Sequence, residues 1–242
     1  MSTTAPRELP AEPKRIVVVS AGTGNPSSTR QLTDRIAQAT LGLLARAGAP
    51  ATTSVIELGP LAVDTARAAV AGFPGEQLQE AIDRLAAADA IIAATPVYKA
   101  GISGLFKSFV DVLDNDLIIA KPVLLAATGG TPRHALVIDD QMRPLFAYMR
   151  ALTLPTSVYA APQDWGTSEL GTRIERAATE LAVMVRAGVE QHVADDAWSS
   201  YQHQFAGNAS RAERAAGDVD FDSPLMRLAA GGRHAPPQRD AA

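Results

Sequence analysis

The fold is decided by residues 15–29, Arg15-Ile16-Val17-Val18-Val19-Ser20-Ala21-Gly22-Thr23-Gly24-Asn25-Pro26-Ser27-Ser28-Thr29. An apolar β-branched run, Ile16 to Val19, ends abruptly in a loop of Ser, Gly, Thr, Asn and Pro. A short apolar run bounded by turn residues is typical of a strand buried on both faces, as in a parallel sheet. A stretch of helical character begins near Ser28 and Thr29. Residues 15–29 therefore predict a buried strand, a polar loop and the start of a helix.

The loop between this strand and this helix has the chemistry of a phosphate site. Its hydroxyls and backbone N–H groups are expected at a helix N-terminus, where unpaired donors and the helix dipole favour an anion. The Lys of a nucleoside triphosphate loop, GxxxxGK[ST], is missing, and Ser27 stands where a dinucleotide fingerprint has its third glycine. A hydroxyl-rich loop without Lys points to a monophosphate such as the tail of FMN. The alternative is a capped strand-to-helix turn without a ligand.

Strands and helices alternate along the rest of the chain. Apolar periodicity predicts helices at 31–48, 77–88, 105–113, 138–152 and 168–193, strands at 53–58, 89–95, 122–127 and 153–160, and a loop with one short helix at 59–75. Five strands alternating with helices are the pattern of an α/β, doubly wound parallel sheet with helices on both faces.

The length of 242 residues fits one α/β domain with an appendage. Residues 1–13, with three prolines, are expected to form a disordered leader, and residues 14–194 the domain. Residues 195–242 form a polar C-terminal extension, expected to be partly disordered, with one short amphipathic patch at 221–228.

Composition excludes several classes of protein. A net charge of -4 argues against a nucleic-acid-coating protein. The absence of Cys excludes disulfides, thiolate catalysis and Cys-based zinc sites, and the four His lack metal-binding spacing. No apolar run is long enough to cross a membrane, and the N-terminus lacks the pattern of a signal peptide. We therefore expect no metal, no nucleic acid and no membrane as partners, and a cytoplasmic location.

Two further loops, 95–101 and 128–134, join the first one at the carboxyl edge of the predicted sheet, where such folds bind ligands. Pro96 to Gly101 places an aromatic residue beside a glycine, which suits a planar isoalloxazine ring. Tyr98 is alternatively a core aromatic. Lys99 is either a solvated charge or a contact to a nicotinamide phosphate, and His134 either contacts the flavin edge or serves in capping or packing. Polar loops after strands are common in α/β proteins. Three such loops at one edge are therefore better evidence for a ligand site than any one of them.

The motifs Ser20-Ala21-Gly22-Thr23-Gly24-Asn25-Pro26-Ser27-Ser28-Thr29, Thr95-Pro96-Val97-Tyr98-Lys99-Ala100-Gly101 and Thr128-Gly129-Gly130-Thr131 occur in this order. With them the chain resembles the NAD(P)H-dependent FMN reductases of flavodoxin-like fold. More narrowly, it resembles the flavin-reductase partners of luciferase-like monooxygenases. The resemblance covers residues 15–190; the longer C-terminal region departs from many of these reductases.

The resemblance implies that Ser20 and residues 27–29 hold the FMN phosphate, that residues 96–99 line the isoalloxazine and that residues 128–131 contact its far edge. It also implies a homodimer or homotetramer with the flavin site at a subunit interface. No catalytic side chain is expected, because the flavin carries the chemistry. The candidate cofactor-binding residues are Ser20, Gly22, Thr23, Asn25, Ser27, Ser28, Thr29, Pro96, Val97, Tyr98, Lys99, Gly101, Thr128, Gly129, Gly130, Thr131 and His134.

The function implied is reduction of FMN by hydride from NADPH or NADH, with reduced flavin supplied to a flavin-dependent monooxygenase. One alternative is a reductase that keeps FMN tightly bound and acts on quinones or azo compounds. Another is a flavodoxin-type electron carrier without nicotinamide chemistry. Such carriers usually have a strongly acidic surface, and the net charge of -4 weighs against one.

Overall fold

The structure, a computed structural model, describes residues 12–197. Most of the predicted leader and nearly all of the C-terminal extension, including the amphipathic patch at 221–228, lie outside these residues. The boundaries expected for the leader, the domain and the extension therefore stay predictions.

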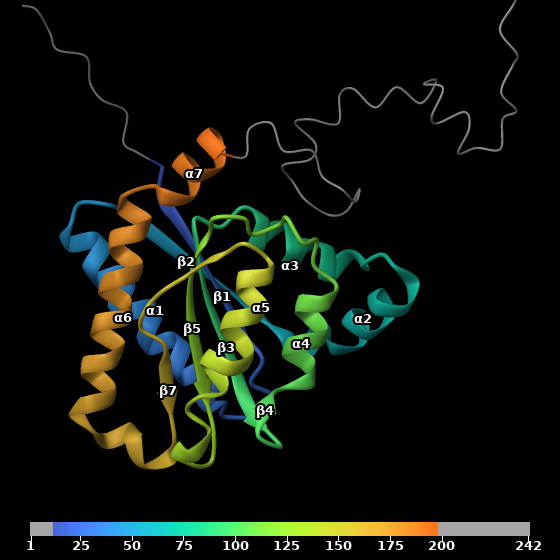
Figure 1. The fold of residues 1–242 in the computed structure, drawn as a ribbon, viewed down its shortest axis with the longest axis horizontal. Coiled ribbons are helices and arrows are strands. Elements are labelled where there is room, and N and C mark those ends of the chain that lie inside the picture. The colour runs from blue at the N-terminus through green and yellow to red at the C-terminus, as the bar shows by residue number, and fades with distance from the viewer. Residues whose placement is uncertain (1–11, 198–242) are drawn as a thin grey trace, which may run out of the picture.

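A parallel sheet forms the centre of the molecule, as predicted (Figure 1). Its strands run in the order β2-β1-β3-β5-β6. The strand that follows β6 in the sequence, β7, also pairs with β5. This is the strand order of flavodoxin-like folds. The bounds are β1 Lys14–Ser20, β2 Ala51–Glu57, β3 Ala90–Tyr98, β5 Pro122–Thr128, β6 Leu152–Thr153 and β7 Val158–Ala160.

Helices cover both faces of the sheet (Figure 1). Residues alternate along each strand, so Ile16 and Val18 of β1 point into one core and Val17 and Val19 into the other. The first core lies under α1 (Ser28–Arg46) and α6 (Ser168–Arg186), which pack against each other. The second lies under α3 (Glu76–Ala86), α4 (Gly104–Asp111) and α5 (Arg143–Tyr148). The doubly wound architecture is therefore confirmed.

The prediction for residues 59–75 was wrong in one respect. A helix of 14 residues, α2 (Leu58–Ala71), occupies most of this stretch, and no loop separates it from β2. Gly59 and Pro60 lie in its first turn, where the missing N–H of proline costs no hydrogen bond. The helix ends at Gly72, whose φ of 80° is easily adopted only by glycine.

Three predicted elements are divided in the structure. The expected strand at 153–160 is two short strands, β6 and β7, with Pro155 between them. The expected helix at 138–152 is a π-helical segment, Ile138–Met142, followed directly by the short α5. The last helix breaks at Gly188, whose φ is 59°, and continues as α7 (Val189–Ala197). Proline and left-handed glycine explain two of the three breaks.

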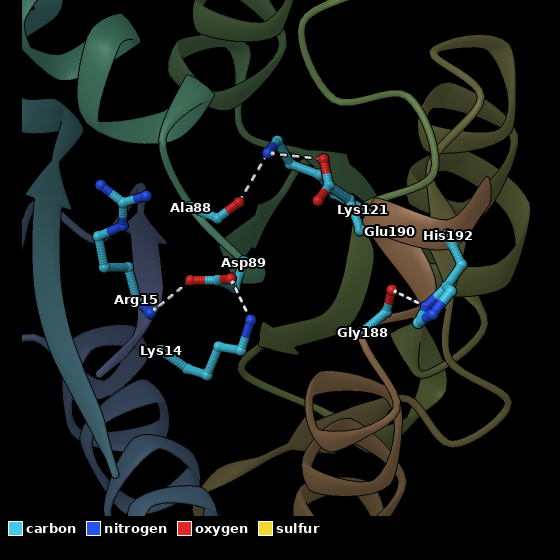
Figure 2. A network of polar contacts seen from close by, with 8 residues as sticks. All are labelled: Lys14, Arg15, Ala88, Asp89, Lys121, Gly188, Glu190 and His192. Carbon is cyan, nitrogen blue, oxygen red and sulfur yellow. Dashed lines mark hydrogen bonds and ion pairs between the residues drawn. The ribbon is translucent and has the colours of Figure 1, made fainter. Parts of the chain in front are cut away.

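The amino ends of the strands carry a network of ionic contacts (Figure 2). Asp89 pairs with Lys14 Nζ at 3.0 Å and accepts a hydrogen bond from the Arg15 N–H at 2.7 Å. Lys121 is buried, donates to the Ala88 carbonyl at 2.6 Å and lies 3.5 Å from Glu190 of α7. These contacts join β1, β3, β5 and α7 at the edge opposite the three loops.

Among residues 12–197, no helix is both long enough and apolar enough to cross a membrane. Within the same part of the chain, no group of three metal-ligating side chains comes together.

Candidate functional site

A pocket of about 500 Å³ opens at the carboxyl edge of the sheet, beyond the ends of β1, β3 and β5. All three predicted loops contribute to it. Its walls are made by glycine, proline, hydroxyl and aromatic residues. The lining residues are Gly22, Thr23, Gly24, Pro26, Ser27, Ser28, Thr29, Pro96, Val97, Tyr98, Thr128, Gly129, Gly130, Ala160, Pro162 and Trp165.

The loop after β1 is packed so closely that only glycine fits at position 22. A Cβ there would lie 2.0 Å from Ser27 Oγ and 2.9 Å from Thr29 Cβ. Ser27 is the N-cap of α1, and its Oγ accepts a hydrogen bond from the Arg30 N–H at 3.2 Å. One donor of the first helical turn is thus taken, while the N–H groups of residues 28 and 29 make no hydrogen bond within the helix. The loop is a cradle with backbone donors at its floor.

Three buried hydroxyl groups, those of Ser20, Thr29 and Thr128, lie at this loop. Ser20 is 1% exposed, and its Oγ has no hydrogen-bond partner among the described residues. Thr29 Oγ1 lies 2.7 Å from Thr128 Oγ1, so the loops after β1 and β5 are hydrogen-bonded to each other. A buried hydroxyl without a partner is costly, so the Ser20 Oγ next to the pocket is a candidate for a ligand contact.

The lining of the pocket, as far as the structure describes it, contains no Lys, Arg, His, Asp or Glu. The nearest cation in sequence, Arg30, is engaged elsewhere. It pairs with Asp34 at 2.8 Å and contacts Glu57, and the hydrogen bond to Asp34 raises the pKa of its guanidinium. Any anion held here is therefore held by N–H and O–H groups.

The loop after β3 is a tight hairpin. Tyr98 pairs with Gly101 at the start of β4 (Gly101–Ile102), which runs antiparallel to β3. The two residues between them, Lys99 and Ala100, have φ values of 51° and 63°. Non-glycine residues in this left-handed region store strain, and such strain is concentrated at functional sites. Tyr98 is 53% exposed, so it is a wall of the pocket and not a core aromatic.

The loop after β5 is fixed by Tyr159 of β7. The phenol donates to the Thr131 carbonyl at 2.6 Å, and the Gly129 N–H donates to the Ala160 carbonyl at 3.2 Å. A Cβ on Gly129 would lie 2.1 Å from Tyr159 Oη. Burial, with a contribution from the charge of Asp164, raises the pKa of Tyr159. The phenol therefore stays a donor, and it holds the far side of the pocket in place.

The model of a known family, described as NADPH-dependent FMN reductase, matches residues 14–166. The chain belongs to this family. It is 39% identical over 172 residues to the FMN reductase (NADPH) of Pseudomonas aeruginosa, covering 70% of this chain and 89% of that protein. It is 37% identical over 172 residues to the NADH-dependent FMN reductase SfnF of Pseudomonas fluorescens, covering 71% of this chain and 89% of that protein.

A solved structure is also similar to the reductase. The crystal structure of an oxidoreductase from Corynebacterium diphtheriae is 41% identical, with a TM-score of 0.71, and covers 73% of this chain and 99% of that one. The protein is therefore an NAD(P)H:FMN oxidoreductase that uses FMN and a reduced nicotinamide. This confirms the family, the fold and the cofactors expected from its sequence.

Eleven of the reductase's predicted site residues lie in the wall of the pocket, and the other six lie around it. Ser20 is buried behind the first loop, and Asn25 is exposed at its tip. Lys99 and Gly101 belong to the hairpin, where the Gln141 side chain accepts from the neighbouring Ile102 N–H at 3.1 Å. Thr131 and His134 lie at the short 3-10 turn after β5. Contact of these six with flavin stays a prediction.

Sequence reasoning missed five lining residues of the reductase. Gly24 and Pro26 belong to the first loop, and Ala160, Pro162 and Trp165 belong to the end of β7 and the turn after it. A signal for this fourth segment was available, because every loop that follows a parallel strand lies at the same edge of the sheet. The polar, proline-containing stretch 161–167 follows a strand in the same way as the other three loops.

Proposed function

We propose that the pocket binds FMN with its phosphate at the N-terminus of α1 and its isoalloxazine between the loops after β3 and β5. The observation that supports this most is the cradle at Gly22, with free backbone donors, the Ser28 and Thr29 side chains and the unpaired hydroxyl of Ser20 beside it. A phosphate has the acceptor oxygens that these donors lack. The walls fit the remaining part of FMN, since Pro96, Val97 and Tyr98 offer apolar surface and glycines allow backbone to approach closely.

The redox chemistry, acceptance of a hydride from reduced nicotinamide, is supplied by FMN when it is bound. The chain's own residues bind and orient the reactants. The strained hairpin fixes Tyr98 at one wall, and Tyr159 fixes the loop of Gly129 and Thr131 at the other. No acidic or basic side chain lines the described pocket, which suits a reaction without protein acid–base catalysis.

We infer further that reduced flavin leaves the pocket and supplies a flavin-dependent monooxygenase. The first support is the sequence resemblance to monooxygenase-partnered reductases. The second is the open, uncharged site: Tyr98 is half exposed, and no cation in the described lining holds the phosphate. A ligand held by neutral donors alone exchanges more readily than one held by ion pairs.

Steady-state kinetics test the first part of this proposal. Purified protein is given NADH or NADPH with FMN, FAD or riboflavin, and nicotinamide oxidation is followed. We expect oxidation that depends on added FMN. A protein that stays yellow through purification and turns over quinones rapidly would support the quinone or azo reductase instead.

A dialysis cell tests the supply of flavin. The reductase and a flavin-dependent monooxygenase are placed on opposite sides of a membrane that passes FMN but not protein, under low oxygen on the reductase side. Product on the monooxygenase side shows transfer by diffusion. Product only when the proteins share one compartment would contradict diffusion and require direct contact.

The assembly and location are also proposals. A homodimer or homotetramer is supported by exposed apolar side chains on and after α2, where Val63, Val70 and Phe73 are 62%, 91% and 70% exposed. Light scattering coupled to size-exclusion chromatography measures the assembly. A cytoplasmic location fits the need for reduced nicotinamide, and cell fractionation tests it.

A further inference from the structure

The turn after β7 places an aromatic residue in the wall of the pocket, and this residue belongs to none of the three sequence motifs. Trp165 lies in the 3-10 turn Pro162–Gly166 and lines the pocket together with Pro162. Asp164 holds this turn: its side chain accepts from the Ala161 N–H at 2.7 Å, and its carbonyl accepts from the Thr167 N–H at 3.0 Å. These two hydrogen bonds hold the turn in one conformation, and the turn thereby fixes the position of Trp165.

Arg35 of α1 supports Trp165 from outside the pocket. Its guanidinium carbon lies 5.1 Å from the centre of the Trp165 ring, which is the geometry of a cation–π contact. In the described part of the chain, no carboxylate forms an ion pair with Arg35. The ring is half buried and packs against the core under α1 and α6.

Trp165 and the loop of Tyr98 both line the pocket but approach it from different faces of the sheet. Val97, next to Tyr98, packs on the core under α3, α4 and α5, whereas Trp165 packs on the core under α1 and α6. The pocket therefore crosses the edge of the sheet from one face to the other. The N-terminus of α1 lies on the same face as Trp165, so Trp165 is at the end where the flavin phosphate is proposed to bind.

We propose that Trp165, supported by Arg35, is the end wall of the pocket and determines which flavin is accepted. This rests on the proposed function, in which the phosphate of the flavin lies at the N-terminus of α1. FMN ends at that phosphate. FAD continues from it with an adenosine monophosphate, which must pass the end wall. A fixed indole at this position admits the mononucleotide and obstructs the dinucleotide.

The test measures affinities of the full-length protein for FMN, FAD and riboflavin by quenching of flavin fluorescence, and KM values for the same flavins. In the unmodified protein we expect FMN to bind at least ~10-fold more tightly than FAD, which is the size of effect one unfavourable pocket contact produces. Trp165→Ala is expected to improve FAD binding about 5-fold and to change FMN binding less than about 3-fold, because it removes an obstruction and no phosphate contact.

Three further variants separate this role from general packing. Trp165→Phe keeps an aromatic wall and should keep most of the preference for FMN. Arg35→Gln frees the ring and should shift the preference toward FAD by a smaller factor than Trp165→Ala, while Arg35→Lys keeps the cation and should shift it least. Melting temperatures identify any variant that fails to fold, in which case the Arg35 pair carries the test.

Each outcome has a distinct meaning. A protein that binds none of the three flavins contradicts the proposed site itself. A protein that binds FMN but whose FMN-to-FAD ratio is unchanged in Trp165→Ala and Arg35→Gln overturns the end wall alone. Weaker FAD binding in Trp165→Ala would also overturn it, because it would show that the indole stacks on the adenine.

Discussion

At the carboxyl edge of the sheet, the loops that follow the strands consist of glycine, proline and hydroxyl residues. At the amino edge, the same strands are flanked by charged side chains that form ion pairs. The pocket lining contains no charged side chain within the described residues. At the other edge, Lys14 and Asp89 pair at 3.0 Å, Arg150 and the buried Asp116 at 2.5 Å, and Lys121 is buried next to Glu190.

This difference in charge indicates that the two edges of the sheet have different roles. At the amino edge, the ion pairs with a buried member, Arg150–Asp116 and Lys121–Glu190, are costly to break, because an uncompensated charge in the interior is unfavourable. Neutral loops leave their backbone donors available for a ligand, at the edge where doubly wound folds bind one. Substitutions at the carboxyl edge should therefore change flavin binding, and substitutions at the amino edge should change stability.

Gly22→Val is expected to have the largest effect. The new side chain would collide with Ser27 and Thr29 and displace the N-cap of α1. We expect FMN affinity to fall by roughly 100-fold, equivalent to about 3 kcal/mol, which is the upper range for overpacking. Isothermal titration calorimetry measures this loss of affinity.

Gly171→Ala is the control. Gly171 lies on an exposed turn of α6 with open space around its Cβ, so this substitution should leave FMN binding unchanged. Equal losses in both variants would contradict a specific cradle.

Lys121→Met tests the opposite edge. It removes a buried donor from the Ala88 carbonyl and leaves Glu190, which is 15% exposed, without this cation. We expect the free energy of unfolding to fall by about 2–3 kcal/mol, because the buried Ala88 carbonyl loses its donor and the attraction between Lys121 and Glu190 is lost. Chemical denaturation measures it. FMN affinity of the folded variant should stay the same; a large loss of affinity would show that the two edges are coupled.

Tyr159→Phe should have a smaller effect than Gly22→Val or Lys121→Met, because it removes one hydrogen bond that holds a wall of the pocket. Loss of the bond to the Thr131 carbonyl should cost about 1 kcal/mol of stability and weaken FMN a few-fold. Its pKa supplies a second readout. Because the native pKa is raised above 10.0, unfolded chains release the phenolic proton first as pH rises, so stability falls at alkaline pH. The melting temperature of the unmodified protein should fall more steeply above about pH 10 than that of the variant; parallel curves would contradict the shift.

Lys107→Gln should have the smallest effect. Lys107 and Asp111, four residues apart on α4, form an ion pair at 2.5 Å, but both side chains are about half exposed. Exposed pairs of this kind contribute about 0.3–0.5 kcal/mol and are screened by salt. Thermal melts at low and high salt should show a small loss that disappears at high salt. A loss as large as that of Lys121→Met would contradict the distinction between surface and buried pairs.

The sequence predicted the central sheet well because each strand is an apolar run between turn residues. Burial on both faces leaves few alternatives for runs such as Ile16 to Val19 or residues 122–127. The errors occurred where one residue type permits two structures. Pro60 fits a strand end or a first helical turn equally well, and the structure uses the second.

The candidate site was predicted in part for a similar reason. Loops with glycine and hydroxyl groups were identified by their chemistry, and their meeting in one pocket follows from the parallel sheet. The loop that carries Trp165 could have been placed at this edge from the sequence, but its contact with Arg35 could not, because the two residues are far apart in the sequence and meet only when α1 and the turn after β7 are both in place. The role of the hairpin depends on φ values at Lys99 and Ala100 that residue types alone do not indicate.

The uncharged lining of the pocket has a consequence for selectivity inside a cell. A full positive charge attracts every phosphate compound over several ångströms, including the abundant free nucleotides. Amide and hydroxyl dipoles, together with the partial positive charge at the N-terminus of α1, attract anions more weakly and over a shorter range than a full charge, so the shape of the ligand contributes a larger share of its affinity. The pocket should therefore discriminate better against other phosphate compounds, and its occupancy should vary less with ionic strength, than a site that holds phosphate with Lys or Arg.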